Sequence, residues 1–203
     1  MNSITKIIAA LALVSVSAFA QSEQVAATAN EGSGLIGKRY AAAGLGYLDV
    51  RHSSYNAFAA GLEYNLPVNQ NIDVLTSFSH TWGEGNDINT VQDLNVTAVS
   101  YLTQGAVKPF VTVGLGYAWT SANDEGLNYN VGIGGEYQLC QRASLTASVD
   151  FSDGFRRRTQ SDLEFSTTVG VNYWASKNVV LKGDVTLIET GHLAYTLSAG
   201  YRF

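Results

Sequence analysis

The chain has 203 residues, of which 46% are hydrophobic and 14% are charged, and its formal net charge at neutral pH is -5. The acidic balance argues against general nucleic-acid binding, because nucleic-acid-binding proteins use an excess of Lys and Arg to neutralise phosphates. The single cysteine, Cys140, excludes an internal disulfide framework, and we interpret it as a small residue at a strand end.

The first residues, "MNSITKIIAALALVSVSAFA", predict a cleaved export signal over residues 1–20. Lys6 precedes an apolar run that is too short to span a bilayer, and Ala18 and Ala20 form a small-residue cleavage site. Residues 21–37 show no sustained period, so we expect a periplasmic N-terminal linker. The remaining residues, 38–203, are then one domain.

From Lys38 onward, apolar and polar residues alternate in a series of segments separated by turn-rich breaks. This period of two predicts β-strands with one apolar face. Ten such segments can be counted, at 41–47, 58–64, 72–82, 91–102, 109–120, 129–139, 145–151, 163–173, 179–187 and 192–203. The alternation is weakest at 72–82 and 91–102, and the count falls to eight if these two segments do not span.

Three features of the segments predict a closed, antiparallel, up-and-down transmembrane β-barrel, an all-β fold. Compact breaks such as "ASKN" interleave with longer polar breaks such as "GEGNDINT", as periplasmic turns interleave with external loops. Tyrosines bracket the aliphatic centres of several segments, as at Tyr129 and Tyr137. A sheet in lipid must also close, because its edges would leave backbone groups unpaired. A secreted soluble barrel with its apolar face inward has the same period and stays open as an alternative.

Charged residues fall on the polar faces, which a membrane barrel turns toward its lumen. One interpretation is an ion-pair network that fills and stiffens the barrel, and the other is a narrow water path whose acidic excess favours cations. The candidates for this lumen network are Glu63, Glu136, Asp150, Glu164, Lys182, Asp184 and Arg202.

The break "GFRRRTQSD" predicts a basic external loop containing Phe155, Arg156, Arg157 and Arg158. Guanidinium groups make bidentate contacts with phosphates, which lipopolysaccharide supplies beside an outer-membrane barrel. The alternative is a solvated loop with incidental contacts.

The "KPFVTVGLGYAW" segment and the terminal "AGYRF" resemble the small outer-membrane β-barrel proteins, the group of OmpA-type transmembrane domains and opacity-type porins. This resemblance implies a location in the outer membrane. There we expect contact with its lipid and lipopolysaccharide, and we expect a monomer. The resemblance also implies that Tyr201 and Phe203 act as the signal read by the barrel-assembly machinery during insertion. Members of this group with chains of similar length have eight strands and long loops, whereas ten strands with short loops are counted here.

No pattern predicts catalysis, a cofactor or a metal site. His52, His80 and His192 lie near expected external ends, with Asp87, Asp124 and Asp153 in loops, but no motif of a barrel protease or deacylase is present. We therefore expect a non-enzymatic outer-membrane barrel with a structural or surface-interaction role. The alternatives are a small cation-leaning channel and, third, a barrel enzyme acting on lipid A or peptides.

Overall fold

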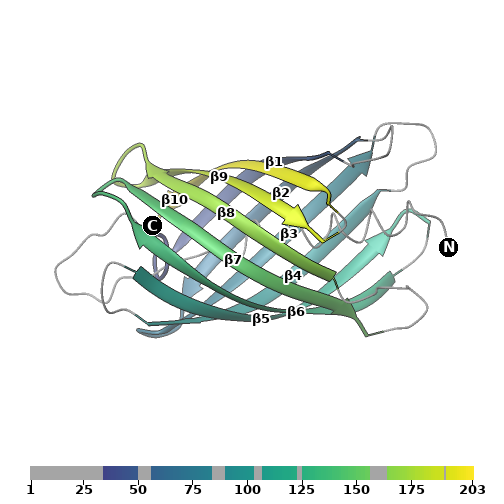
Figure 1. The fold of residues 1–203 in the computed structure, drawn as a ribbon, viewed down its shortest axis with the longest axis horizontal. Coiled ribbons are helices and arrows are strands. Elements are labelled where there is room, and N and C mark those ends of the chain that lie inside the picture. Colours follow the sequence, from purple (N-terminus) through teal and green to yellow (C-terminus); the bar gives the residue numbers. More distant parts are fainter. Residues whose placement is uncertain are drawn as a thin grey trace.

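The computed structural model describes residues 34–49, 56–83, 90–102, 107–122, 125–155, 164–189 and 191–203. The described residues form ten strands: β1 (Tyr40–Asp49), β2 (Asn56–Pro67), β3 (Ile72–Gly83), β4 (Val91–Tyr101), β5 (Val107–Thr120), β6 (Glu125–Gln138), β7 (Ala143–Gly154), β8 (Glu164–Trp174), β9 (Val179–Ile188) and β10 (Leu193–Arg202). Each strand pairs antiparallel with the next, and β1 pairs with β10, so the sheet is a closed barrel (Figure 1). The prediction of ten strands is confirmed, and the two weakest segments are the spanning strands β3 and β4.

The alternation in the sequence separates an outer from an inner face. On β10, Leu197 is 73% exposed, whereas its neighbours Thr196 and Ser198 are buried. The same pattern places exposed leucines, valines and tyrosines on the outside all around the barrel. A protein in water rarely exposes so much contiguous apolar surface, so this outer face fits lipid, and the alternative of an inward apolar face is wrong.

Aromatic side chains gather on the outer face toward both ends of the barrel. At one end Phe58 lies between Tyr47 and Trp82, with ring centroids 5.5 and 6.3 Å away. At the other end Tyr201 contacts Phe203, with the centroids 5.6 Å apart. Amphipathic rings favour the two membrane–water interfaces, so these two groups match interfacial girdles around an aliphatic band.

The two ends of the barrel differ. We call the end where β1 begins and β10 ends the terminal mouth; its connections are residues 68–71, 102–106, 139–142 and 175–178. The opposite end is the loop mouth, with connections 50–55, 84–90, 121–124, 155–163 and 189–192. None of the described segments is a helix long and apolar enough to cross a bilayer.

The weak alternation of β3 and β4 has a structural cause. Their inner faces carry apolar residues near the terminal mouth, where Leu75, Val99 and Tyr101 are buried. These strands are therefore apolar on both faces over part of their length, and a period of two is hidden there. Val99 and Tyr101 pack against Ile36, in the chain segment that precedes β1.

Candidate functional site

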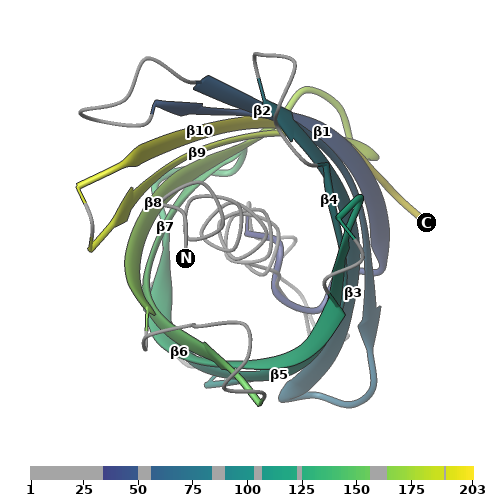
Figure 2. The ribbon, with the colours of Figure 1, turned by 90° about the vertical axis from the view of Figure 1, so that its right-hand side faces the viewer.

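A short segment before β1 crosses the barrel interior at the terminal mouth. We call this segment, residues 34–38, the strap; in Figure 2 it is part of the purple trace inside the ring of strands. Leu35 packs in one cluster with Tyr40, Ala42, Trp174 and Val180. Ile36 packs in another cluster, on β4 and β5, with Val99, Tyr101 and Phe110. The strap therefore contacts separate parts of the wall, and its two apolar side chains are nearly fully buried.

Backbone hydrogen bonds fix the strap between two inner carboxylates. The Leu35 amide donates to Glu136 Oε1 on β6 at 3.2 Å, and the Gly37 amide donates to Asp73 Oδ2 on β3 at 2.8 Å. Gly37 has a φ of 75°, a left-handed conformation that favours glycine. The strap thus turns sharply between its two anchors.

Lys38 is the last residue of the strap and links it to the barrel wall. Its ammonium group donates to the Gly34 carbonyl at 2.6 Å and lies 4.3 Å from the centroid of the Trp174 ring. Its carbonyl accepts a hydrogen bond of 3.0 Å from the Asn65 side chain. A buried cation needs such partners, because an uncompensated charge in the interior is costly.

The strap region adjoins a buried ion pair that joins strands far apart in the sequence. The Lys182 ammonium on β9 donates to both carboxylate oxygens of Glu63 on β2, at 2.9 and 3.2 Å. The Tyr40 hydroxyl donates to the same carboxylate. Both charged side chains are essentially inaccessible, with exposures of 1% for Lys182 and 0% for Glu63. This pair ties β2 and β9 together across the inner face of β1 and β10.

Glu136 has a second set of partners besides the strap. Ser144 donates to its Oε1 at 2.6 Å, and the Asn172 amide lies 3.5 Å from the same oxygen and 3.3 Å from Ser144 Oγ. This carboxylate therefore links β6, β7 and β8 to the strap. Lys108 lies opposite Glu136 in the register of β5 and β6, on the same inner face.

Farther from the terminal mouth, two inner carboxylates lie flat against the wall over glycines. A Cβ at Gly132 would lie 2.1 Å from Asp150 Oδ1, and a Cβ at Gly170 would lie 2.0 Å from Asp184 Oδ1. Ser148 donates to Asp150 at 2.8 Å. The glycines thus give each side chain room on the neighbouring strand, so that it need not point along the barrel axis.

This close approach predicts a cost for a methyl group at Gly170. Gly170→Ala forces Asp184 from its place, and we expect the barrel to lose about 1–3 kcal/mol of stability, as other overpacked interiors do. Urea unfolding in lipid vesicles measures the loss. Gly46→Ala is the control, because its Cβ would meet nothing nearer than Ala59 Cβ at 3.5 Å. Equal unfolding midpoints for the two variants would contradict the close packing.

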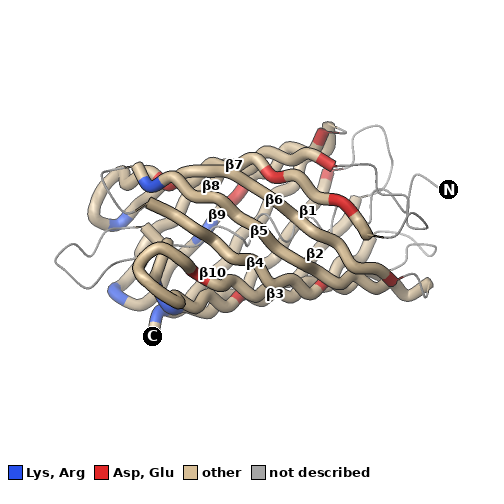
Figure 3. The backbone as a smooth tube through the Cα atoms, turned by 90° about the horizontal axis from the view of Figure 1, so that it is seen from below, with Lys and Arg blue, Asp and Glu red and all other residues tan. Residues whose placement is uncertain are grey.

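Charge is distributed unevenly along the barrel (Figure 3). The Lys and Arg residues that the structure describes all lie in its terminal half, namely Lys38, Arg39, Lys108, Arg142, Lys177, Lys182 and Arg202. Acidic residues occupy the loop mouth, at Asp49, Glu125, Asp153, Glu164 and Glu189. The inner face is acidic overall, because its strands also carry Glu63, Asp73, Asp93, Glu136, Asp150 and Asp184.

The structure brings together some of the charged residues expected in the lumen and separates others. Glu63 and Lys182 form one pair, and Asp184 lies two residues beyond Lys182 on the same face. Glu136 has its own partners near the strap, and Asp150 lies on β7. Glu164 begins β8 at the loop mouth, whereas Arg202 ends β10 at the terminal mouth. The expected network is thus several groups at different heights.

The expected basic loop is only partly described. Phe155 is exposed at the loop mouth, with its ring 5.1 Å from that of Tyr129, while Arg156, Arg157 and Arg158 lie outside the described residues. At the other mouth, Tyr201 and Phe203 are exposed on the outer face. The Phe203 amide donates to the Arg39 carbonyl at 3.1 Å, which joins the end of β10 to the start of β1.

The N-terminal predictions fall mainly on residues that are not described. The signal at 1–20 and most of the linker, residues 21–33, lie outside the described residues. The last four residues of the expected linker, 34–37, belong to the strap and lie mostly buried within the terminal mouth.

Sequence reasoning missed Lys38, Tyr40, Asp73 and Asp93 as inner polar residues. Asp73 and Asp93 lie in the two segments with weak alternation, so their face could not be assigned from the period. In the structure Asp73 accepts hydrogen bonds from Asn65 at 2.8 Å and Tyr101 at 3.2 Å. Asp93 accepts one of 3.2 Å from Asn128. A signal was present for the two aspartates, because the same face carries Ser77 and Ser79 after Asp73, and Asn95 and Thr97 after Asp93.

The histidines do not form a catalytic group among the described residues. His80 lies on the outer face beside Trp82, and its Nδ1 is 2.9 Å from the Gln92 amide. His192 lies at the start of β10, whereas His52, Asp87 and Asp124 fall outside the described segments. Asp153 lies on β7, where the Gly154 amide donates to it at 2.7 Å.

In the described part of the chain, no cluster of three or more His, Cys, Asp or Glu residues could hold a metal. Cys140 is free and exposed in the turn after β6.

No protein-family model and no curated protein matches the sequence. Among solved structures, the translocator domain of the autotransporter NalP from Neisseria meningitidis is similar over 100% of both chains, at 9% identity and a TM-score of 0.59. The KdgM porin in complex with disordered oligogalacturonate matches 82% of this chain and 99% of its own, at 12% identity and a TM-score of 0.43. Neisserial surface protein A matches 81% of this chain and 94% of its own, at 12% identity and a TM-score of 0.42. The chain therefore has the fold of the outer-membrane β-barrel proteins.

Proposed function

We propose that the chain is an integral outer-membrane barrel that acts as a structural or surface-interacting protein rather than as an open channel. The apolar outer band and its two aromatic girdles support the membrane location. Even strand number places both termini at one mouth, and the terminal mouth then faces the periplasm. The narrower kinship with OmpA-type and opacity-type barrels rests on the sequence resemblance alone. We further propose a monomer, inserted by the assembly machinery through its Tyr201 and Phe203 end.

The observation that carries this proposal is the strap. Leu35 and Ile36 pack against separate inner clusters, and the carboxylates of Glu136 and Asp73 hold the amides between them. Because the strap crosses the lumen between these anchors, we expect a water path at this level to require that the strap leaves. The buried pair of Lys182 and Glu63 lies in the same half of the barrel, so the inner charges there have partners within the wall.

A closed lumen directs the search for function to the loop mouth. The chain leaves β7 at Phe155 and re-enters β8 at Glu164, so the segment with Arg156, Arg157 and Arg158 begins and ends at this mouth. If the loop mouth faces outward, these guanidinium groups meet the phosphates of lipopolysaccharide.

The surface role predicts a large effect of charge reversal in this loop. Replacing Arg156, Arg157 and Arg158 by Glu should weaken retention of the folded barrel on immobilised lipopolysaccharide at least tenfold, because three attractive contacts become repulsive. Replacing Arg142 and Lys177 by Glu, which changes exposed cations at the terminal mouth, is the control and should leave retention unchanged. Equal retention of the loop variant and the wild type would remove the proposed role of this loop.

A small cation-leaning pore is the second candidate, and the acidic inner face favours it. On the described strands, inner carboxylates outnumber the inner cations, which are Lys108, Lys182 and Arg202. An excess of carboxylates along a lumen attracts cations. This candidate requires unitary currents whose cation selectivity falls in Asp184→Asn. Wild-type currents with selectivity unaffected by that change would exclude Asp184 from the path.

A further inference from the structure

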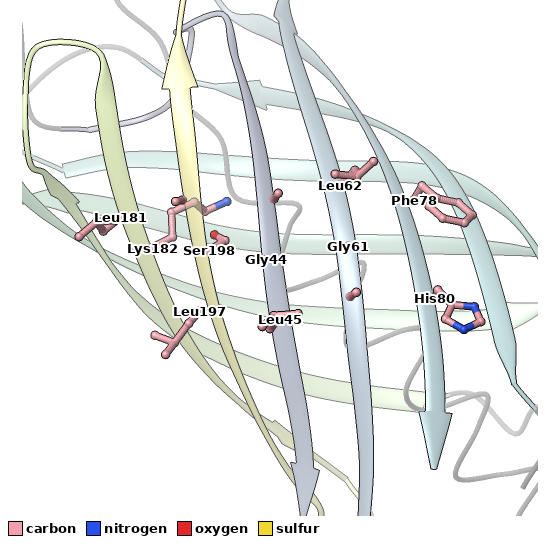
Figure 4. A pocket seen from close by; sticks show the side chains of 13 residues that line it. Gly44, Leu45, Gly61, Leu62, Phe78, His80, Leu181, Lys182, Leu197 and Ser198 are labelled. Carbon is pink, nitrogen blue, oxygen red and sulfur yellow. The ribbon is translucent and has the colours of Figure 1, made fainter.

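The outer wall is hollowed where β1 closes the barrel between β10 and β2. The hollow has a volume of about 810 Å³, which is within the range of small-molecule sites. Small outward side chains make its floor, and four leucines with Phe78 and His80 surround it (Figure 4). The floor residues are Ala43, Ala60 and Ala199, and the leucines are Leu45, Leu62, Leu181 and Leu197.

Small outward residues of β1 mark a path from the terminal mouth to this hollow. The outward residues of β1 from that mouth are Ala41 and then Ala43. Ala41 pairs with Tyr64 on β2 and with Tyr201 on β10. The small Ala41 side chain therefore lies between two interfacial tyrosines. The path and the hollow together are the seam groove.

Cationic side chains lie where the seam groove opens. Arg39 is exposed just before β1, and its Nε donates to the Tyr64 hydroxyl at 2.7 Å. The Phe203 amide bonds to the Arg39 carbonyl, and the Arg202 amide bonds to Asn178 beside Lys177. Arg39 and Lys177 therefore lie on one stretch of the rim over β1, β10 and β9, whereas the Arg202 side chain belongs to the inner face.

We propose that the seam groove binds one anionic phospholipid, with its phosphodiester at Arg39 and an acyl chain passing Ala41 into the hollow. This inference rests on the proposed membrane location, which puts the terminal mouth at the phospholipid leaflet. Arginine suits a phosphate, and the apolar hollow suits an acyl chain. A second copy of the chain fits less well, because a two-fold contact would set one hollow against another and leave both unfilled.

Native mass spectrometry of the folded chain in detergent tests the site, with phosphatidylglycerol and phosphatidylcholine as probes. The wild type should retain phosphatidylglycerol about fivefold more tightly than phosphatidylcholine, the effect of one cation near an anionic headgroup. Arg39→Gln should abolish this preference. Ala43→Leu, which fills the floor of the hollow, should weaken the binding of both lipids at least fivefold. Arg142→Gln and Ala98→Leu are matched controls, since they change an exposed cation in the β6–β7 turn and an outward alanine on β4.

Several results would overturn the proposal. These are equal retention of the two lipids by the wild type, equal effects in the control variants, a preference for lipopolysaccharide that Arg39→Gln removes but the Glu variant of Arg156, Arg157 and Arg158 keeps, or a dimer that excludes lipid. A gel shift on heating reports separately whether each variant is a folded barrel. Failure of the wild type to fold in detergent or vesicles would refute the proposed function, whereas a folded barrel without lipid preference refutes only the seam groove.

Discussion

Lys182→Met should destabilise the barrel by about 3 kcal/mol, the largest loss expected from any single change in the lumen. The substitution leaves the Glu63 carboxylate buried with Tyr40 but without its cation. Removing one partner of a buried ion pair costs about 3–5 kcal/mol, because the remaining charge has lost its compensation. Urea unfolding in lipid vesicles, followed by tryptophan fluorescence, measures the change.

The double variant with Glu63→Gln and Lys182→Met distinguishes a lost pair from lost packing. It removes both charges, so we expect at least half of the lost stability to return. Lys177→Met in the exposed β8–β9 turn is the control and should change stability by less than about 0.5 kcal/mol. Additive losses from Lys182→Met and Glu63→Gln would show that the two side chains do not stabilise each other.

A variant with Leu35→Asp and Ile36→Asp should open the terminal mouth. Both side chains lose their apolar contacts, and two carboxylates are added near Glu136 and Asp73. Repulsion between like charges and the cost of burying them should expel the strap from the lumen. We expect discrete current steps in planar bilayers, with a preference for cations, where the wild type gives none.

The matched control for the strap variant lies at the same mouth but outside the lumen. Leu102 and Leu139 are exposed beside the terminal connections, and replacing both by Asp adds the same charge without touching the strap. This control should stay silent. Steps in the control, or silence in a strap variant that is folded by gel shift, would show that the strap does not close the mouth.

The period of two made the fold accessible from the sequence, because each residue of a single-layer barrel faces either lipid or lumen. On β10, Leu197 is 73% exposed and its neighbours Thr196 and Ser198 are buried. The alternation of apolar and polar residues in the sequence predicts this arrangement directly. The same rule placed Glu63, Glu136 and Lys182 among the expected inner residues.

Contacts across the lumen could not be predicted in the same way. Lys182 and Glu63 are 119 residues apart, and their meeting depends on the stagger of four strands rather than on any local pattern. The strap lacks a strand period because it belongs to no strand, so it resembled a linker. Buried apolar residues on the inner faces of β3 and β4 also hid the alternation that would have revealed Asp73 and Asp93.

A folded ten-stranded barrel should be closed at the terminal mouth by its own strap. Single-channel recording of the wild-type protein in planar bilayers, after a gel shift has shown that it is folded, measures whether this mouth conducts ions. We expect no current steps at moderate voltages. Regular unitary steps from the folded wild type would contradict this expectation and would favour the cation-leaning pore.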